Sequence, residues 1–448
     1  MKGRQVALAA ASVAALTVTL GVSGWKVHSA SKVRLRGVWF LVNKTCNLFG
    51  LLQTLPGLPA LHELHGQVIE AERLAFGDGV EVEDAKKQLW DIQTDGADAK
   101  GNRFTPLGRL LFSKDLTQRL MRRLRFAEFV QKQPPSAFAE PSKCIIIVGL
   151  PRTGSTLISR LLTSDPKSRC PRYWEFAHND PDVSSADPER LDEDPRSAPV
   201  DKGFALLKIF SPNGLAEFFA FHKVGANEHE EIAGFSRRYF WDMETALLAP
   251  SAQARRLEWQ TSASVDRSFL ATHMRAWLSL QRTLPGQFWV LKSPAVTAWL
   301  PEHAEAFEDA SFVFTSRDPA SVVPSIAGLN EVALSVKYDY GGGLKPLGDG
   351  VVGRLLGYAG KQAEFAEGWK GRCCEIKYAD MLKDPIEQAR RVYEHAGREL
   401  GPAVEEAMRS HARGNKKGKH GRADYSLEKF ELGEGDMRKF EAYRERFC

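Results

Sequence analysis

The pattern of apolar and polar positions predicts an α/β fold built on a parallel sheet. Residues 144–148 are apolar and mostly β-branched, which is typical of a strand buried on both faces. Two further short apolar runs, residues 287–291 and 311–315, are interpreted as strands of the same sheet. Helical spacing begins at Ser155 after the first run and covers residues 320–329 after the third. This alternation indicates a parallel sheet flanked by helices.

Further helices and one edge strand are expected around this centre. The pattern is helical over residues 61–133, and the arginines of the last helix, over residues 110–130, are interpreted as a solvated basic face rather than a membrane-surface helix. These arginines are Arg119, Arg122, Arg123 and Arg125. The polar stretch that ends near Asp201 is expected to be a loop. Helices are expected at 203–241, 265–284 and 385–397, and an edge strand at 373–378.

The N-terminal region carries an uncharged run, residues 6–25, of about the length that spans a bilayer. We interpret it as a single-pass membrane anchor, with a cleaved signal peptide as the alternative. Basic residues on both sides leave the orientation open, so the expected location is a Golgi-type lumenal face in a eukaryote and the cytoplasmic face otherwise. Asn43 begins a glycosylation sequon that matters only on a lumenal side.

These features divide the chain into three expected regions. The anchor and juxtamembrane segment occupy residues 1–50, a helical region residues 51–135, and the α/β domain residues 136–448, with Pro134 and Pro135 marking the last boundary. The net charge of +5 suits anionic ligands but falls short of a nucleic-acid-binding footprint. The six cysteines lack the spacing of metal ligands, and Cys170 is a candidate for a disulfide in an oxidising compartment.

A glycine-containing loop follows the first strand. Gly149 and Gly154 permit a positive φ, and the start of a helix at Ser155 directs backbone N–H groups and the positive end of the helix dipole at one point, which suits a phosphate. The spacing is that of the P-loop of nucleotide triphosphatases, except that Ser155 replaces the lysine and Arg152 appears within the loop. A phosphate ester other than a hydrolysed triphosphate is therefore expected, with a P-loop kinase or a plain turn as alternatives.

Each of the three strands is followed by a cation. Arg152, Lys292 and Arg317 should meet at the carboxyl edge of the sheet, where open parallel sheets bind ligands. A basic, glycine-spaced segment at 414–422 suits a second phosphate, with a solvated charge run as the equal alternative. Residues 227–231 surround His229 with carboxylates, either as a base or metal site or as an exposed acidic helix face.

These motifs together resemble the PAPS-dependent sulfotransferase superfamily, in particular its branch of bacterial-type and algal sulfotransferase-domain proteins. The likeness covers most of the chain after about residue 61. It implies that the loop holds the 5′-phosphosulfate end of 3′-phosphoadenosine 5′-phosphosulfate (PAPS), and that Arg317 with Ser325 holds the 3′-phosphate. The basic tail is similar to the family's closing segment. The implied donor-binding residues are Arg152, Thr153, Gly154, Ser155, Thr156, Arg317, Ser325, Lys419 and Arg422.

The resemblance implies in-line transfer of a sulfuryl group from PAPS to a hydroxyl of a glycan, a lipid or another alcohol, without a metal. Arg152 and Lys292 would neutralise the departing oxygens. Pro294 stands where cytosolic members carry a histidine base, so the implied base is Glu175, by its position after the loop helix. The alternatives are a structural ion pair between Glu175 and Arg172, and His229 as the base. A P-loop kinase and a non-catalytic nucleotide-binding membrane protein stay open as alternative functions.

Overall fold

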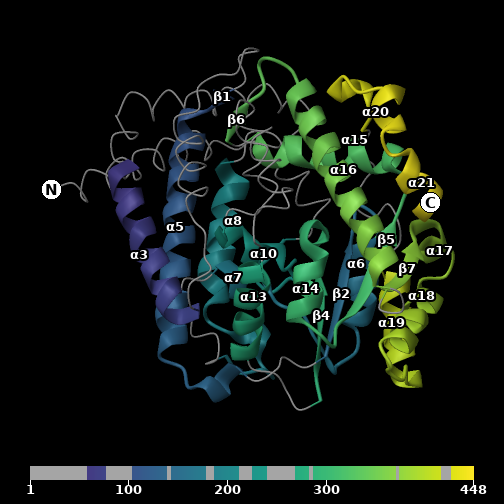
Figure 1. Cartoon of the computed structure of the whole chain (residues 1–448), viewed down its shortest axis with the longest axis horizontal. Coiled ribbons are helices and arrows are strands. Elements are labelled where there is room, and N and C mark those ends of the chain that lie inside the picture. Colours follow the sequence, from purple (N-terminus) through teal and green to yellow (C-terminus); the bar gives the residue numbers. More distant parts are fainter. Residues whose placement is uncertain are drawn as a thin grey trace, which may run out of the picture.

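A five-stranded parallel sheet forms the centre of the protein (Figure 1). The computed structural model describes residues 58–76, 103–138, 143–177, 186–210, 224–239, 268–281, 286–335, 337–369, 373–414 and 425–448. The strand order is β3-β4-β2-β5-β7, and each pairing is parallel. The strands are β2 (Cys144–Gly149), β3 (Ser168–Arg169), β4 (Phe288–Lys292), β5 (Ser311–Ser316) and β7 (Cys373–Lys377). The predicted parallel sheet, its three main strands and the edge strand are confirmed.

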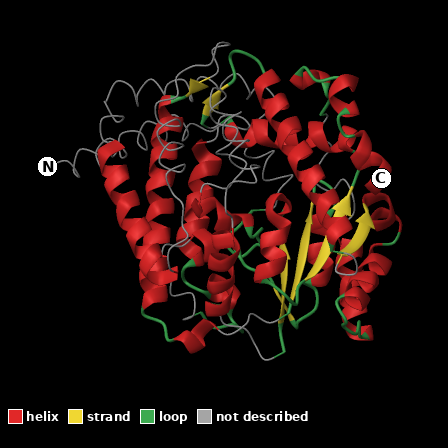
Figure 2. Ribbon diagram, in the orientation of Figure 1, coloured by secondary structure: helices red, strands yellow, loops and turns green. Residues whose placement is uncertain are grey.

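Strand β2 is buried along its whole length because helices cover both faces of the sheet (Figure 2). Ile145 and Ile147 pack with the apolar side of α6 (Ser155–Leu162) and with α18 (Pro385–His395) and α19 (Pro402–Gly414). Ile146 and Val148 belong to the larger cluster on the opposite face. Alternate side chains of β2 thus pack into hydrophobic clusters on opposite faces of the sheet. The run is apolar throughout because both sets of side chains are buried.

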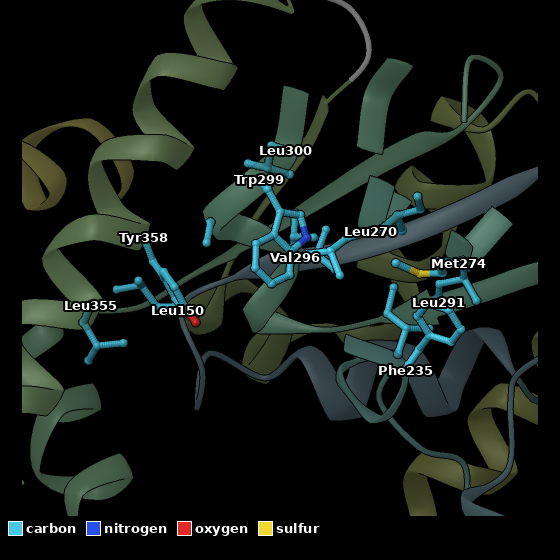
Figure 3. Packing of buried hydrophobic residues seen from close by; sticks show 14 of the residues in the cluster. Leu150, Phe235, Leu270, Met274, Leu291, Val296, Trp299, Leu300, Leu355 and Tyr358 are labelled. Carbon is cyan, nitrogen blue, oxygen red and sulfur yellow. The ribbon is translucent and has the colours of Figure 1, made fainter. Parts of the chain in front are cut away.

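A large part of the larger cluster comes from helices that follow β3 in the chain. They are α13 (Ser268–Leu280), α14 (Leu300–Ala306), α15 (Pro319–Leu334) and α16 (Lys345–Gly368). Figure 3 shows Trp299 and Val296, from the turn after β4, between Tyr358 of α16 and Leu270 and Met274 of α13. This packing fixes the turn at the carboxyl end of β4, immediately after Lys292.

The N-terminal helices share this core. Helices α3 (Leu58–Phe76) and α5 (Pro106–Gln131) pack along each other, and Leu61, Phe112 and Leu116 belong to the same apolar cluster as the sheet. The short strand β1 (Arg103–Phe104) pairs with β6 (Tyr338–Asp339) in an antiparallel manner. The helical pattern predicted over 61–133 is confirmed for α3 and α5, whereas residues 77–102 lie outside the described residues. Both helices are joined to the α/β core through a continuous hydrophobic cluster.

The interpretation of the α5 arginines as a solvated face is wrong for two of them. Arg119 and Arg123 have only 1% and 2% of their surface exposed. Arg123 donates to both carboxylate oxygens of Glu72 in α3, at 2.8 and 2.6 Å, and Arg119 donates to Asp115 at 2.9 Å. A guanidinium tolerates burial when a carboxylate matches its charge and geometry. The sequence pattern of α5 shows the arginines but not the partner that α3 supplies.

Two further expectations are corrected in the region after the sheet's first crossover. Helix α8 (Ser197–Phe210) begins before Asp201, within the stretch expected to be a loop, and α7 (Tyr173–Ala177) is a short helix. Residues 224–232 have no helix, so the carboxylates around His229 do not form an acidic helix face. A short helix, α10 (Ala233–Ser236), follows them.

Several predictions fall outside the described residues. They are the anchor at residues 6–25, the sequon at Asn43 and the basic residues Lys419 and Arg422. Among the helices that the structure describes, none combines the length and apolarity needed to cross a bilayer.

Candidate active site

The glycine loop between β2 and α6 has the conformation that its sequence predicts. Gly149 has φ 114° and Gly154 has φ 90°, both in the region that L side chains rarely adopt. A Cβ atom on Gly149 would lie 2.3 Å from the backbone oxygen of Thr315 in β5, which is closer than atoms can approach. Arg152 also has a positive φ, 63°, which is uncommon for a residue with a side chain and costs conformational energy.

Buried hydroxyls hold this loop in place. The Thr153 hydroxyl donates to the Leu150 carbonyl at 2.6 Å and lies 2.6 Å from the hydroxyl of Thr315. The Gly149 N–H donates to the hydroxyl of Thr297 at 2.9 Å. Thr153 as a whole residue has no exposed surface, so its hydroxyl serves the internal structure of the loop. The loop is therefore preorganised by contacts from two neighbouring segments of the sheet edge.

The first turn of α6 supplies an anion-binding surface. Gly154 is the N-cap, and the first amides of a helix have no acceptor within it. At the start of α6 these amides belong to Ser155 and Thr156, and the helix dipole adds positive potential there. The Lys292 ammonium donates to the Thr156 hydroxyl at 3.3 Å, so the end of β4 meets the first turn of the helix.

The other two expected cations also lie against the loop. The Arg152 Nε donates to the Ser325 hydroxyl of α15 at 3.2 Å, and the Arg317 Nη1 donates to the carbonyl of Arg152 at 3.2 Å. Burial lowers the pKa of Arg152, and the nearby charge of Arg317 lowers it further. The structure thus brings Arg152, Lys292, Arg317 and Ser325 together at the carboxyl edge of the sheet.

Asp318 and Pro319 explain why Arg317 is held at this edge. The Asp318 carboxylate accepts from the N–H of Ala320 at 2.9 Å and so caps α15, and Pro319 occupies the first turn. The chain must therefore leave β5 at Arg317 and turn directly into the helix.

Two tyrosines of the site escaped the sequence analysis. The Arg317 guanidinium lies over the ring of Tyr378, 4.4 Å from its centroid, and that ring packs against Gly154, where a Cβ atom would lie 3.0 Å away. The ring of Tyr425 packs on Gly328 of α15, where a Cβ atom would lie 2.1 Å away. The available signal was Gly328 itself, since a glycine inside a helical pattern can mark a close approach by another part of the chain.

Glu175 forms a buried ion pair, and its partner is Arg169 rather than the expected Arg172. The guanidinium of Arg169 donates to the two carboxylate oxygens at 2.5 and 3.2 Å, and the backbone N–H of Arg172 donates at 2.6 Å. The Glu175 side chain has 0% exposure. These contacts fit a structural role and leave no accessible carboxylate oxygen for an acceptor hydroxyl, contrary to the assignment of Glu175 as general base.

The segment that contains His229 crosses the carboxyl end of β4. His229 forms an isolated antiparallel bridge with Arg172; it retains an exposed surface, while partial burial of the ring and the charge of Arg172 lower its pKa to about 4. Burial and the adjacent Glu231 raise the pKa of Glu230 to about 7. Glu231 pairs with Lys292 at 2.7 Å, a contact between residues too far apart in the sequence to be anticipated.

The described residues offer neither a metal site nor a disulfide at Cys170. Within the described ranges, no group of three or more His, Cys, Asp or Glu side chains has the arrangement of a metal site. Cys170 is a free, buried thiol, and burial raises its pKa to about 12. The disulfide considered for Cys170 is therefore absent from the described structure, and its thiol is unreactive at neutral pH.

Comparison with known proteins identifies the family to which the chain belongs. The family model described as "Sulfotransferase family" matches residues 144–402, more than half of the chain. The chain belongs to this sulfotransferase family. The match contains β2, the glycine loop, Lys292, Arg317 and Ser325, and it confirms the resemblance inferred from the motifs.

Individual relatives show how far the likeness extends. The chain is 30% identical over 113 residues to omega-hydroxy-beta-dihydromenaquinone-9 sulfotransferase Stf3 of Mycobacterium bovis and of Mycobacterium tuberculosis, which is 24% of this chain and 28% of theirs. The matched part is thus little more than a quarter of those curated relatives.

Solved structures share the fold over a longer range. The sulfotransferase STF9 of Mycobacterium avium has a TM-score of 0.70 at 22% identity, covering 86% of this chain and 96% of that one. STF1 of Mycobacterium tuberculosis has a TM-score of 0.63, also at 22% identity, over 86% and 98%.

The buried ion pair between Glu175 and Arg169 leads to a prediction about stability. Glu175→Gln keeps the shape of the side chain but leaves the Arg169 charge uncompensated, so the free energy of unfolding should fall by about 3–5 kcal/mol. Urea denaturation followed by circular dichroism measures this loss. Asp192→Asn is the control, since Asp192 pairs with Arg172 while 68% exposed and should cost at most about 1 kcal/mol. An unchanged stability with abolished turnover would instead restore Glu175 as the base.

Proposed function

We propose that this protein transfers a sulfuryl group from PAPS to a hydroxyl-bearing acceptor. The observation that carries the proposal is the meeting of Arg152, Lys292 and Arg317 around a glycine loop that has Ser155 in place of the P-loop lysine. Family membership supports this reaction. A P-loop kinase is disfavoured, because that fold positions the transferred phosphate with the loop lysine.

The donor would bind across the carboxyl edge of the sheet. The backbone amides of Ser155 and Thr156 suit the 5′-phosphate, because they lie at the start of α6. Arg317 and Ser325 suit the 3′-phosphate, since both already contact Arg152 on the side of the loop away from Lys292. Lys419 and Arg422, which lie outside the described residues, are proposed as further cations for this phosphate.

Arg152 and Lys292 are proposed to act on the transfer itself. PAPS supplies an activated sulfuryl group bonded to a phosphate oxygen, and that oxygen gains negative charge as the bond breaks. The two cations lie on the loop and beside Thr156, where they would stabilise this charge. The positive φ of Arg152 supports the role, because an uncommon backbone conformation is retained at a partly buried cation of the loop.

The acceptor is proposed to be a hydroxyl on a lipid, with a glycan or another alcohol as alternatives. The name of the Stf3 relatives refers to a hydroxylated menaquinone, and the apolar run at residues 6–25 suits a substrate in a bilayer. Labelled PAPS with farnesol, 4-nitrophenol and dextran as acceptors tests the function directly. We expect transfer without ATP. Phosphorylation from ATP would favour a kinase, and retention of PAP without turnover would favour a silent nucleotide-binding protein.

The proposed donor site predicts a specific loss in Arg317→Ala. Charge-assisted hydrogen bonds to a phosphate contribute about 1.5–3 kcal/mol, so the variant should lose about that much of its preference for PAP over AMP, which lacks the 3′-phosphate. Isothermal titration calorimetry measures both affinities. Lys377→Ala, an exposed cation at the end of β7, should keep the full preference. Equal preferences in wild type and Arg317→Ala would refute the assignment.

Unlike Arg317→Ala, the variant Arg152→Gly should lose catalytic rate rather than nucleotide affinity. Glycine accepts the backbone conformation of Arg152, so the substitution removes the cation with little change in the loop. We expect kcat to fall by about 10²–10³ with a small change in the KM for PAPS, because the charge is needed most in the transition state. Steady-state kinetics that show a raised KM and a normal kcat would make Arg152 a ground-state phosphate contact.

The anchor is proposed to hold the enzyme at a membrane, as a single-pass segment over residues 6–25. Removing residues 1–50 should leave a folded enzyme that binds PAP with unchanged affinity and no longer sediments with membranes. The cut lies before α3, whose Leu61 and Val68 are needed for the core. Continued membrane association of the truncated protein would contradict the proposal.

A further inference from the structure

The segment before α10 places an additional carboxylate at the proposed transfer site. The backbone N–H of Ile232 donates to the carbonyl of Lys292 at 3.1 Å, and the N–H of Glu230 donates to the carbonyl of Pro171 at 2.9 Å. These bonds fasten the segment between the end of β4 and the chain that leaves β3. Glu231 is consequently held at the carboxyl edge of the sheet, next to the last residue of β4.

Lys292 connects this carboxylate to the glycine loop. Its ammonium lies 2.7 Å from Glu231 Oε1 and donates to the Thr156 hydroxyl at 3.3 Å. The Glu231 carboxylate is therefore within two hydrogen-bond lengths of the first turn of α6, where the sulfuryl group would be held. The negative charge of Glu231 also favours the protonated form of the Arg152 guanidinium. The carboxylate thus faces the two cations that the proposed function places at the reacting group.

Glu231 differs from the other acidic side chains nearby in its partner, Lys292, more than in its exposure, since Glu228 is exposed to nearly the same extent, 23%. Glu175 is fully buried against Arg169, and Glu230 directs an oxygen to the backbone N–H of Glu231 at 2.9 Å. Glu228 pairs with Arg160, at 3.5 Å. The Glu231 side chain has 26% exposure and contacts Lys292 on one side only. It combines accessibility to an incoming acceptor with a position beside the loop.

We propose that Glu231 is the general base of this enzyme, which takes the proton from the acceptor hydroxyl during sulfuryl transfer. The inference rests on the proposed function. The acceptor oxygen forms a bond to sulfur while the bond between sulfur and the phosphate oxygen breaks, and the electron pair of that bond leaves with the phosphate. The hydroxyl proton passes to a Glu231 oxygen and then to water, so the carboxylate is regenerated.

In this mechanism the Lys292 ammonium has two competing partners, the Glu231 carboxylate and the anionic donor. In the structure it neutralises Glu231, and an anionic donor at the start of α6 would compete for the same ammonium. As Lys292 turns toward the donor, Glu231 loses a hydrogen-bond donor and gains a free oxygen for the acceptor. The ion pair therefore couples arrival of the donor to release of the base.

Substitutions at Glu231 distinguish a base from a residue that only positions Lys292. Glu231→Gln keeps an oxygen that accepts from Lys292 but cannot take up a proton, whereas Glu231→Ala removes both functions. For a base we expect kcat to fall about 10²–10⁴-fold in Glu231→Gln. The affinity for PAP, measured by calorimetry, should not fall and should rise if Lys292 is released from its ion pair with Glu231. Glu231→Asp should restore part of the rate. The matched control is Glu228→Gln, in the same segment, with near-normal turnover.

The pH profile supplies a second readout. The groups that face Glu231 are Lys292, Arg152 and the adjacent Glu230, whose pKa is raised to about 7. If Glu231 is the base, the decline in wild-type kcat on the acid side should disappear in Glu231→Gln, while Glu230→Gln should retain it. Assays use PAPS with the member of the farnesol, 4-nitrophenol and dextran panel that wild type sulfates fastest.

The outcomes separate the two proposals. The assignment of Glu231 as base would be overturned by one combination of results. In it, the wild-type enzyme sulfates an acceptor, Glu231→Gln keeps most of its turnover and Glu231→Ala does not. Glu231 would then be a positioning residue for Lys292. A wild-type protein that transfers nothing to any acceptor of the panel would refute the proposed function, and with it the base.

Discussion

The close approach of Gly149 to the backbone of Thr315 is the constraint on which the site depends. No side-chain carbon fits between β2 and β5 at this point, so position 149 requires a glycine. The positive φ of Gly149, together with those of Arg152 and Gly154, lets the chain turn from β2 into α6. The loop is then locked by buried hydroxyls rather than by a ligand. An anion site built in this way is formed before its ligand arrives, which lowers the entropic cost of binding.

The same strand arrangement determines where the cations lie. The chain leaves β2 toward one edge of the sheet through β3 and β4, and it then crosses to the other side of β2 to form β5. Lys292 and Arg317 thus flank the glycine loop from opposite sides, at the point where open parallel sheets bind ligands. Their mutual repulsion is tolerable because Glu231 neutralises one and the Tyr378 ring covers the other.

Local sequence patterns were sufficient to predict most of the sheet and the residues of the proposed donor site. A fully apolar run, two glycines at fixed spacing and a cation after each strand were sufficient to anticipate β2, the loop and the edge at which Arg152, Lys292 and Arg317 meet. The remaining features depend on contacts between distant segments. Burial of Arg123 requires Glu72 from another helix.

The general base illustrates the same limit. Spacing alone pointed to Glu175, since nothing in the sequence shows that Arg169, six residues earlier, occupies both of its carboxylate oxygens. Glu231 was noted only as one of the carboxylates around His229, because the sequence predicted a helix there and the segment is irregular. Irregular segments are positioned by hydrogen bonds to the sheet edge, such as the one from Ile232 to Lys292, and these have no sequence signature.

The last helix, α21 (Glu441–Phe447), has a consequence for the donor site. The Ser316 hydroxyl donates to the carbonyl of Phe447 at 2.8 Å, and Arg444 pairs with Asp318 at 2.9 Å, so α21 is fastened to both neighbours of Arg317. If Arg317 holds the 3′-phosphate as proposed, docking of this helix and occupancy of that position should be thermodynamically linked, and such a linkage is reciprocal. A nucleotide that engages Arg317 should slow the fraying of α21, and the end of the chain should become more resistant to carboxypeptidase digestion as the site fills.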